Sequence, residues 1–120
     1  MHAEKIEFSS VGHAIAAPDA LGSSNSEVMA TRAVHINVFV KEAVGSEALL
    51  LKRAYNEVGA EAGISHDAYY ETEGAVTDMI IMGTLYQHRE VRRVMAGNPT
   101  VANLLRAVEA VVEAAARSET

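Results

Sequence analysis

Hydrophobic and polar positions alternate most regularly between Ala33 and Val40. Branched apolar side chains occupy every second position of this segment, at Val34, Ile36, Val38 and Val40. The positions between them carry His35, Asn37 and Phe39. Alternate side chains of a strand share a face, so the pattern predicts a strand with one packed face. The other face carries two polar groups, and it is either wet or part of a site.

Three further segments have extended or ambiguous patterns. Ala75–Tyr86 is nearly continuous in apolar residues after a polar start, which predicts a buried central strand. Lys5–Ala16 alternates loosely and predicts one strand or two short ones. Gln87–Arg93 either extends a hairpin, since Val91 and the following Val94 are apolar, or forms a helical turn.

Two segments have the spacing of amphipathic helices. The first has Ser46 as its expected N-cap and Gly63 as its expected C-cap. Its apolar positions are Leu51, Ala54, Tyr55, Val58 and Ala62. The second begins at Pro99 and Thr100, with Thr100 the expected N-cap. Its apolar stripe is Val101, Leu104, Leu105, Val108, Val112 and Ala115. Ala17–Thr31 contains Pro, Gly and a Ser-rich cluster, which predict a loop or short helical turns.

These elements predict a single domain over residues 1–120 of the α/β class, built as an α+β two-layer sandwich. We expect a mixed sheet of about three or four strands with two main helices on one face. No predicted helix is left for the other face of the sheet. An uncovered apolar face favours association, so we expect a homo-oligomer that forms through it.

Composition narrows the classes of function. The net charge is −6 and there is no run of Lys and Arg, so nucleic acid is not an expected partner. The absence of cysteine excludes disulfides, cysteine metal sites and thiol nucleophiles. The longest apolar runs are far shorter than the ~20 residues that span a bilayer, and the first residues lack an apolar signal core. We therefore expect a cytoplasmic protein that has no membrane partner.

The most informative polar segment is Tyr69–Asp78, where a Gly-containing turn leads into the apolar strand. Asp78 lies near the mouth of this strand, and burial there would make its carboxyl a candidate acid or base. Glu71 and Glu73 lie on the same approach. The alternative is that Thr77 and Asp78 bond to the backbone of the turn and that both glutamates are solvated.

Other catalytic patterns are weaker. The five histidines are His2, His13, His35, His66 and His88, and none has metal-ligand spacing. A metal site would have to gather His35 and His66 with Asp67 or Asp78; the alternative is that the histidines are surface or core residues. There is no nucleophile elbow, dinucleotide fingerprint or phosphate-binding loop. Met79 and Met82 are expected in the core, or alternatively in an apolar ligand groove.

Three stretches, taken in order, resemble the C-terminal half of the adenosylcobinamide amidohydrolases, which act in corrinoid salvage. The first is the strand Ile36–Phe39, which is followed by a helix that begins near Ser46. The second is Thr72–Ile81, which matches a Gly-rich Thr-Asp motif that leads into an apolar strand. The third is the Ala96–Thr100 turn before a helix that contains Leu104-Leu105.

The chain departs from the family pattern in several ways, including a shorter helix between Ser46 and Gly63. The N-terminal half of the family has no counterpart here. Pro99 stands where the family has a His in the turn, and Glu73 stands where it has a Gly. These departures favour the alternative that this chain keeps the fold without the activity, unless subunits of an oligomer complete the site.

The resemblance implies hydrolysis of the aminopropanol amide of adenosylcobinamide, with a corrinoid as substrate or ligand and no metal or other cofactor. It makes Asp78 the candidate base and Thr77 its polar support. The residues expected to bind substrate are Asn37, His35, Glu73, Gly74 and Gly97. The alternative function is a non-catalytic small-molecule-binding or oligomeric module of the same fold. A third hypothesis is a metal-dependent hydrolase that uses His35, His66 and nearby acids.

Overall fold

A computed structural model describes residues 1–118 of the chain. The strands are β1 (His35–Val44), β2 (Glu61–Ile64) and β3 (Val76–Thr84). The helices are α1 (Val11–Ala20), α2 (Ser26–Ala33), α3 (Gly45–Glu57), α4 (His66–Tyr69), α5 (Leu85–Met95) and α6 (Ala102–Arg117). A 3₁₀ turn, η1 (Pro99–Val101), precedes α6. Among these helices, none combines the length and hydrophobicity that crossing a bilayer requires.

The sheet has the strand order β1-β3-β2, and both pairings are antiparallel. The expected strands at Ala33–Val40 and Ala75–Tyr86 are therefore confirmed, although the sheet is not mixed. The strands β1 and β2 run parallel to each other and are joined through α3, but β3 lies between them and pairs antiparallel with both. Neighbouring strands of this sheet are therefore all antiparallel. The β1–β3 register shifts between Val40 and Ala43, which is a β-bulge.

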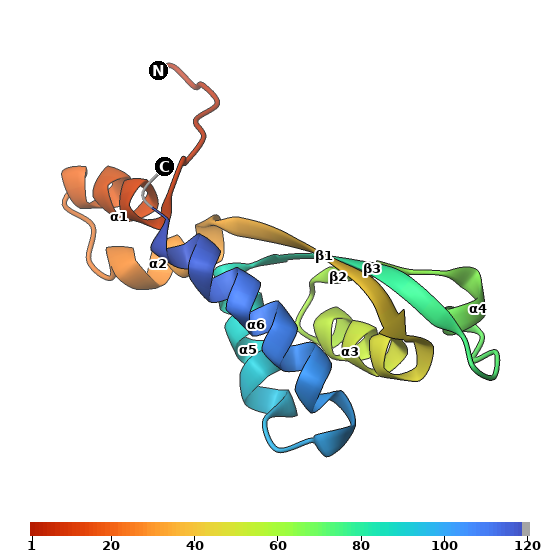
Figure 1. Cartoon of the computed structure of the whole chain (residues 1–120). Coiled ribbons are helices and arrows are strands. Elements are labelled where there is room, and N and C mark those ends of the chain that lie inside the picture. Colours follow the sequence, from red (N-terminus) through yellow and green to blue (C-terminus); the bar gives the residue numbers. More distant parts are fainter. Residues whose placement is uncertain (119–120) are drawn as a thin grey trace.

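One side of the sheet is covered by α3, α5 and α6, which gives the two-layer α+β sandwich expected from the sequence (Figure 1). This layer contains three main helices rather than two, because Leu85–Met95 forms α5 and not a hairpin extension. The core lies between the layers, and its largest fully buried side chains are Tyr55, Leu51, Met79, Ile81, Leu85, Val38, Val91, Val101 and Val108. Met79 is thus a core residue, whereas Met82 is exposed on the other side of the sheet.

The first amphipathic helix is shorter than its apolar spacing predicted. It begins at Gly45 rather than after Ser46, and it ends at Glu57 rather than at Gly63. Gly59 ends this segment because it adopts a left-handed φ of +83°, which glycine reaches without steric cost. Ala62 had fitted the helical stripe, but it lies in β2, where alternation also turns it toward the core.

Residues 11–20 and 26–33 form helices, so the strands expected in Lys5–Ala16 were wrong. Of the two alternatives for Ala17–Thr31, the structure has helix in both halves with a short loop at residues 21–25 between them. Ser10 caps α1 by accepting a 3.0 Å hydrogen bond from the backbone N–H of His13. Alanine is the strongest helix former, and four alanines lie within α1. Figure 1 shows α1 and α2 side by side at the end of the sheet where β1 begins.

The last helix is confirmed as α6, and its buried residues are Leu104, Leu105, Val108 and Val112. Its entry differs from the expectation, because Thr100 lies inside η1. The side chain of Asn98 caps this turn by accepting a 3.0 Å bond from the N–H of Thr100. Asn and Asp bond in this way to backbone groups two residues ahead.

Candidate functional site

The face of the sheet that points away from the helices carries a band of exposed apolar side chains. In the described residues, these are Phe39 and Val44 of β1 together with Val76, Ile80 and Met82 of β3. Phe39 is paired with Ile80 and Val44 with Val76. Directly paired side chains touch across an antiparallel ladder, so each pair forms an apolar contact across the two strands, with Asp78 between the two pairs. We call this surface the open face.

Three of the expected site residues also lie on the open face. His35 and Asn37 are exposed on β1, and Asp78 is exposed on β3. Asn37 pairs with Met82, which lies four positions along β3 from Asp78. At about 3.3 Å per residue, Asp78 and Asn37 are roughly 13 Å apart along the strand. One protein chain therefore does not bring them together around a small reacting group.

Asp78 has a structural contact of its own. Its Oδ1 accepts a 3.0 Å hydrogen bond from the backbone N–H of Glu42 across the β-bulge. Glu42 has a φ of +59°, which is uncommon for a residue other than glycine. The carboxylate thus stabilises a strained point of β1. The burial that would have made Asp78 a candidate acid or base is absent.

Thr77 points to the opposite face of the sheet and is buried. Its hydroxyl accepts a 2.8 Å bond from the N–H of Ser65 and donates a 2.5 Å bond to the carbonyl of Asp78. Because adjacent strand residues alternate in direction, Thr77 and Asp78 cannot act on one substrate from the same side. Their contacts are the backbone bonds that the alternative interpretation of this segment predicted.

The remaining expected site residues lie at other parts of the molecule. Glu73 and Gly74 are exposed in the turn between α4 and β3, where Gly74 has a φ of +73°. Gly97 lies after α5, with a φ of +81°, at the turn that leads to η1. Figure 1 shows these two turns at separate ends of the structure. The positive φ of each glycine accounts for its place in a tight turn.

A buried polar pair escaped the sequence analysis. The Tyr55 hydroxyl of α3 lies 2.7 Å from Nδ1 of His88 on α5, and both side chains are buried. His88 Nε2 lies 2.7 Å from the carbonyl oxygen of Ile36 in β1. A carbonyl only accepts, so Nε2 carries the proton and Nδ1 accepts from the Tyr55 hydroxyl. The pair therefore joins both layers of the fold.

Burial favours the uncharged forms of both Tyr55 and His88. Desolvation lowers the pKa of His88, the bond to Ile36 opposes that change, and the charge of His35 adds to it. Desolvation also raises the pKa of Tyr55, and the carboxylate of Glu109 raises it further. Both groups are therefore neutral near pH 7. The sequence did hold a signal for His88, because Leu85, Val91 and Met95 form a helical stripe that includes it.

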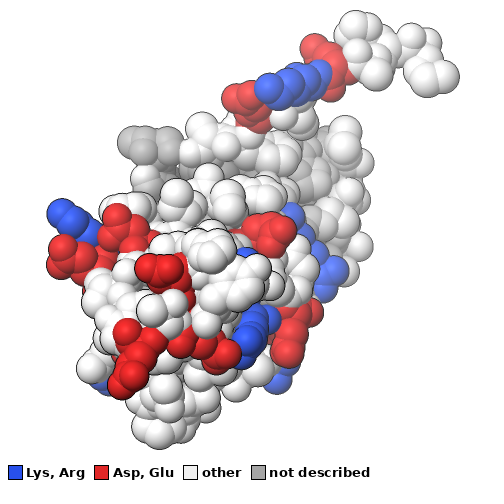
Figure 2. Space-filling model, turned by 90° about the vertical axis from the view of Figure 1, so that its right-hand side faces the viewer, with Lys and Arg blue, Asp and Glu red and all other residues white. Residues whose placement is uncertain are grey.

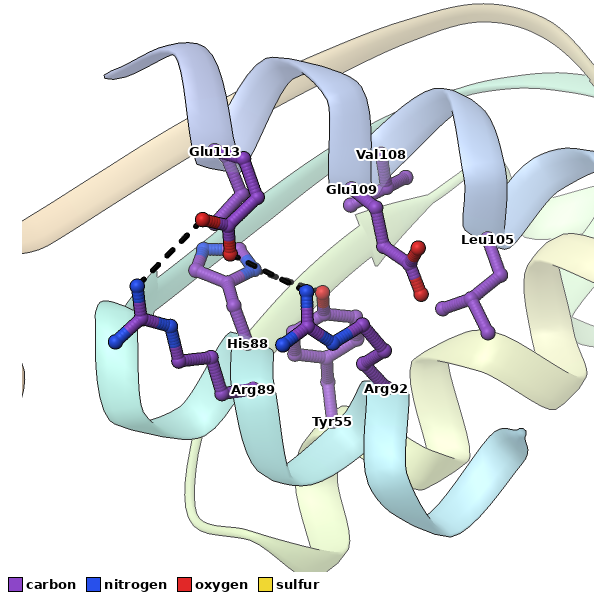
Figure 3. Close-up of a pocket in the computed structure, with 9 residues that line it drawn as sticks. Tyr55, His88, Arg89, Arg92, Leu105, Val108, Glu109 and Glu113 are labelled. Atoms are coloured by element: carbon purple, nitrogen blue, oxygen red, sulfur yellow. Dashed lines mark hydrogen bonds and ion pairs between the residues drawn. The ribbon is translucent and has the colours of Figure 1, made fainter. Parts of the chain in front are cut away.

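A small hollow lies above this pair, between α5 and α6 (Figure 3). Glu113 of α6 lies at the edge of this hollow and forms ion pairs of 3.5 Å with Arg89 and 3.3 Å with Arg92, both on α5. The cavity has a volume of about 10 Å³, which is the space of roughly one water molecule. Both ring nitrogens of His88 are already engaged, so this cluster has a structural role and does not form a substrate site.

In the described part of the chain, no three His, Asp or Glu side chains are placed so that they could hold a metal ion. His66 lies in α4, where its ring contacts that of Tyr70 at 4.5 Å between centroids. His35 lies at the start of β1. Comparisons with protein-family models, with curated proteins and with solved structures find no match to this chain.

Proposed function

We propose that this protein is a non-catalytic module that self-associates through the open face of its sheet. The observation that carries the proposal is the exposure of Phe39, Ile80 and Val76, at 60%, 47% and 62% of their surface. Phe39 and Ile80 are strand-paired neighbours, whereas Val76 is paired with Val44 on the far side of Asp78. Contiguous exposed apolar surface on a folded domain commonly marks an interaction site.

The charge distribution of the protein supports association through the centre of the open face. Figure 2 views the end of the molecule that carries α4, where acidic side chains outnumber basic ones. The chain as a whole has a net charge of −6, so two copies repel each other at long range. The row of Phe39, Ile80 and Gly63 at the centre of the open face carries no charge, and Asp78 and Glu61 lie on either side of it. It is therefore the part of the sheet where two copies can approach with the smallest electrostatic cost.

The placement of the expected catalytic residues also favours a non-catalytic module. Thr77 is buried on the helix side while Asp78 is exposed on the open face. Both make hydrogen bonds that hold the backbone. A general base has to lie within hydrogen-bond reach of the proton it abstracts, in a site that also positions the substrate.

Sedimentation over a wide range of protein concentration tests self-association directly. Because the chain has no cysteine, single-cysteine variants give an unambiguous second readout. Under mild oxidation Ile80→Cys, at the centre of the open face, should form a disulfide-linked dimer. Val94→Cys is the matched control, because Val94 is similarly exposed but lies on α5. A protein that stays monomeric at every concentration would overturn the proposal.

A second candidate function is corrinoid amide hydrolysis, as in the family that the sequence resembles. The observation in its favour is that His35, Asn37 and Asp78 share the open face and are exposed. In an oligomer, residues of two copies could then surround one corrinoid. The test is to incubate the protein with adenosylcobinamide and analyse the corrinoid by chromatography. Release of aminopropanol with formation of adenosylcobyric acid would establish it, and an unchanged corrinoid would leave the non-catalytic module as the proposal.

A further inference from the structure

At the centre of the open face, side-chain size decreases from one strand to the next across the sheet. Ile80 of β3 pairs with Phe39 of β1 on one side and with Gly63 of β2 on the other. One row therefore runs from a large aromatic side chain through a branched one to no side chain at all. A Cβ built on Gly63 meets no atom within 4 Å, so there is open space above it. Neighbouring strands are about 4.8 Å apart, which places Phe39 and Gly63 about 10 Å from each other.

We infer that the partner at this face is a second copy of the chain, with Phe39 of each copy filling the space above Gly63 of the other; this inference rests on the proposed self-association. The arrangement requires a two-fold axis that lies parallel to the strands and passes over β3. This operation places β1 over the partner's β2 and each Ile80 against its own counterpart. A two-fold interface has to be self-complementary, and the graded row satisfies that condition.

The alternative two-fold axis lies across the strands and fits this surface less well. It would place the two Phe39 side chains against each other and the two Gly63 residues over an empty space. Packed sheets lie about 10 Å apart with interdigitated side chains, so large residues have to face small ones. The axis parallel to the strands meets this requirement at both ends of the row.

The same axis places the Asp78 carboxylates of the two copies in one row. The hydrogen bond that each carboxylate makes within its own copy limits the repulsion between the two carboxylates. Each carboxylate accepts a 3.0 Å hydrogen bond from Glu42 N–H and so leans toward its own β1. The two-fold axis reverses that direction in the partner, so the two carboxylates lean apart. Lys41 and Glu42 are both exposed on β1 beside this row, so their opposite charges offset each other. Some repulsion remains, and added salt should screen it.

The size of the face sets the expected strength. β1 and β3 have about nine residues each and β2 has four, which gives a face of roughly 350 Å² for each copy at about 3.3 Å per residue and about 4.8 Å per strand. A standard stable interface buries about 800 Å² for each partner. The dimer should therefore be weak, and its population should change with protein concentration over the micromolar to millimolar range.

Two variants and their mixture test the arrangement. Phe39→Ala removes the filling side chain, and Gly63→Phe occupies the space that receives it, so each variant alone should dimerise about tenfold or more weakly than the wild type. In an equimolar mixture, the truncated side chain of the first variant meets the added aromatic ring of the second. The unchanged Gly63 of the first variant meets the unchanged Phe39 of the second. The mixed dimer should therefore form preferentially and recover most of the wild-type affinity.

Val111→Ala and Val94→Phe are matched controls, since both residues are exposed apolar positions on the helical layer. They should leave dimerisation unchanged, alone or mixed. Thermal unfolding checks that each variant folds. With an axis across the strands, Phe39→Ala would relieve the contact between the two Phe39 side chains, and Gly63→Phe would fill the empty space between the two Gly63 residues. Neither variant alone would then dimerise more weakly than the wild type, and that result would overturn the inference while leaving self-association intact. A wild-type protein that never dimerises would overturn the inference and the proposed function together.

Discussion

The hydroxyl of Tyr55 lies 2.7 Å from Nδ1 of His88, and this contact ties α3 to α5 inside the core. The second nitrogen of the same ring lies 2.7 Å from the Ile36 carbonyl of β1. One neutral imidazole therefore connects three elements that are remote in sequence. A buried polar group of this kind contributes to stability only while both of its bonds are made.

Stability should fall as the pH drops below about 6.5 because of His88. Burial lowers its pKa in the folded state, whereas the unfolded chain keeps the ordinary value of about 6.5. Below that pH the unfolded state binds a proton that the folded state does not, so protonation favours unfolding. The loss approaches about 1.4 kcal/mol per pH unit until the folded-state pKa is reached. Chemical denaturation at a series of pH values measures it.

The control for this pH dependence is His66→Gln, which removes an exposed histidine. It should leave the acid-induced loss in place, whereas His88→Gln should remove most of it, whatever its effect at pH 7. An unchanged pH profile in His88→Gln would assign the loss to other groups.

Tyr55→Phe should destabilise the fold by about 1–3 kcal/mol. The substitution keeps the packed ring but leaves Nδ1 of His88 without a donor in a buried place. Equilibrium unfolding in denaturant measures the change. Tyr70→Phe is the matched control, because the Tyr70 ring is 66% exposed and should cost little. Equal effects of the two changes would show that the buried contact contributes nothing specific.

Thr84→Ala should cost about 0.5–2 kcal/mol through the loss of a helix cap. Thr84 Oγ1 accepts a 3.1 Å bond from Gln87 N–H, while Gln87 Oε1 accepts a 2.9 Å bond from Thr84 N–H. Gln87 also donates to the Val58 carbonyl, so its replacement by Ala should cost more than that of Thr84. The expected order is thus Gln87→Ala, then Thr84→Ala, then the exposed control Thr100→Ala. A reversed order in the unfolding free energies would contradict it.

Gly45→Ala should be among the most destabilising single changes in the chain. A Cβ at this position would lie 2.7 Å from the backbone oxygen of Ala75, which also accepts a 2.8 Å bond from Gly45 N–H. Backbone has to move to relieve such a contact, at a typical cost of about 1–3 kcal/mol. Gly63→Ala is the matched control, with open space around its Cβ, and should be neutral or slightly stabilising in the strand. Thermal melts of both variants give the comparison.

The two long strands could be predicted because their patterns depend on local alternation and continuous apolar sequence. The same alternation already implied that Thr77 and Asp78 point to opposite faces, once Ala75–Tyr86 was assigned as a strand. In contrast, the bond between Asp78 and Glu42 joins residues 36 positions apart across a bulge. No local pattern encodes such a contact, so the structural role of this carboxylate could not be derived from spacing.

The N-terminal helices and the start of α5 show the other limits of the sequence analysis. In α1, small apolar residues lie on all sides and only Ala14 is buried. The apolar positions of this segment therefore show no helical periodicity from which a helix could be predicted. For α5, the Thr84–Gln87 capping box was a readable start signal that the hairpin alternative obscured. The register of β2 depends on its pairing with β3 and not on its four residues alone.

Asp78→Asn separates the proposals for the open face. The amide oxygen can still accept the bond from Glu42 N–H, so the monomer should keep nearly the same unfolding free energy. If two copies meet with both Asp78 residues in one row, removal of the two charges should tighten the dimer and weaken its dependence on salt. Sedimentation at low and high salt measures both effects. Glu73→Gln is the control, since it removes an exposed acid from the adjoining turn and should change association less. Hydrolysis of adenosylcobinamide by the wild type, with loss of turnover in Asp78→Asn at unchanged stability, would instead establish this carboxylate as the base of an amide hydrolase.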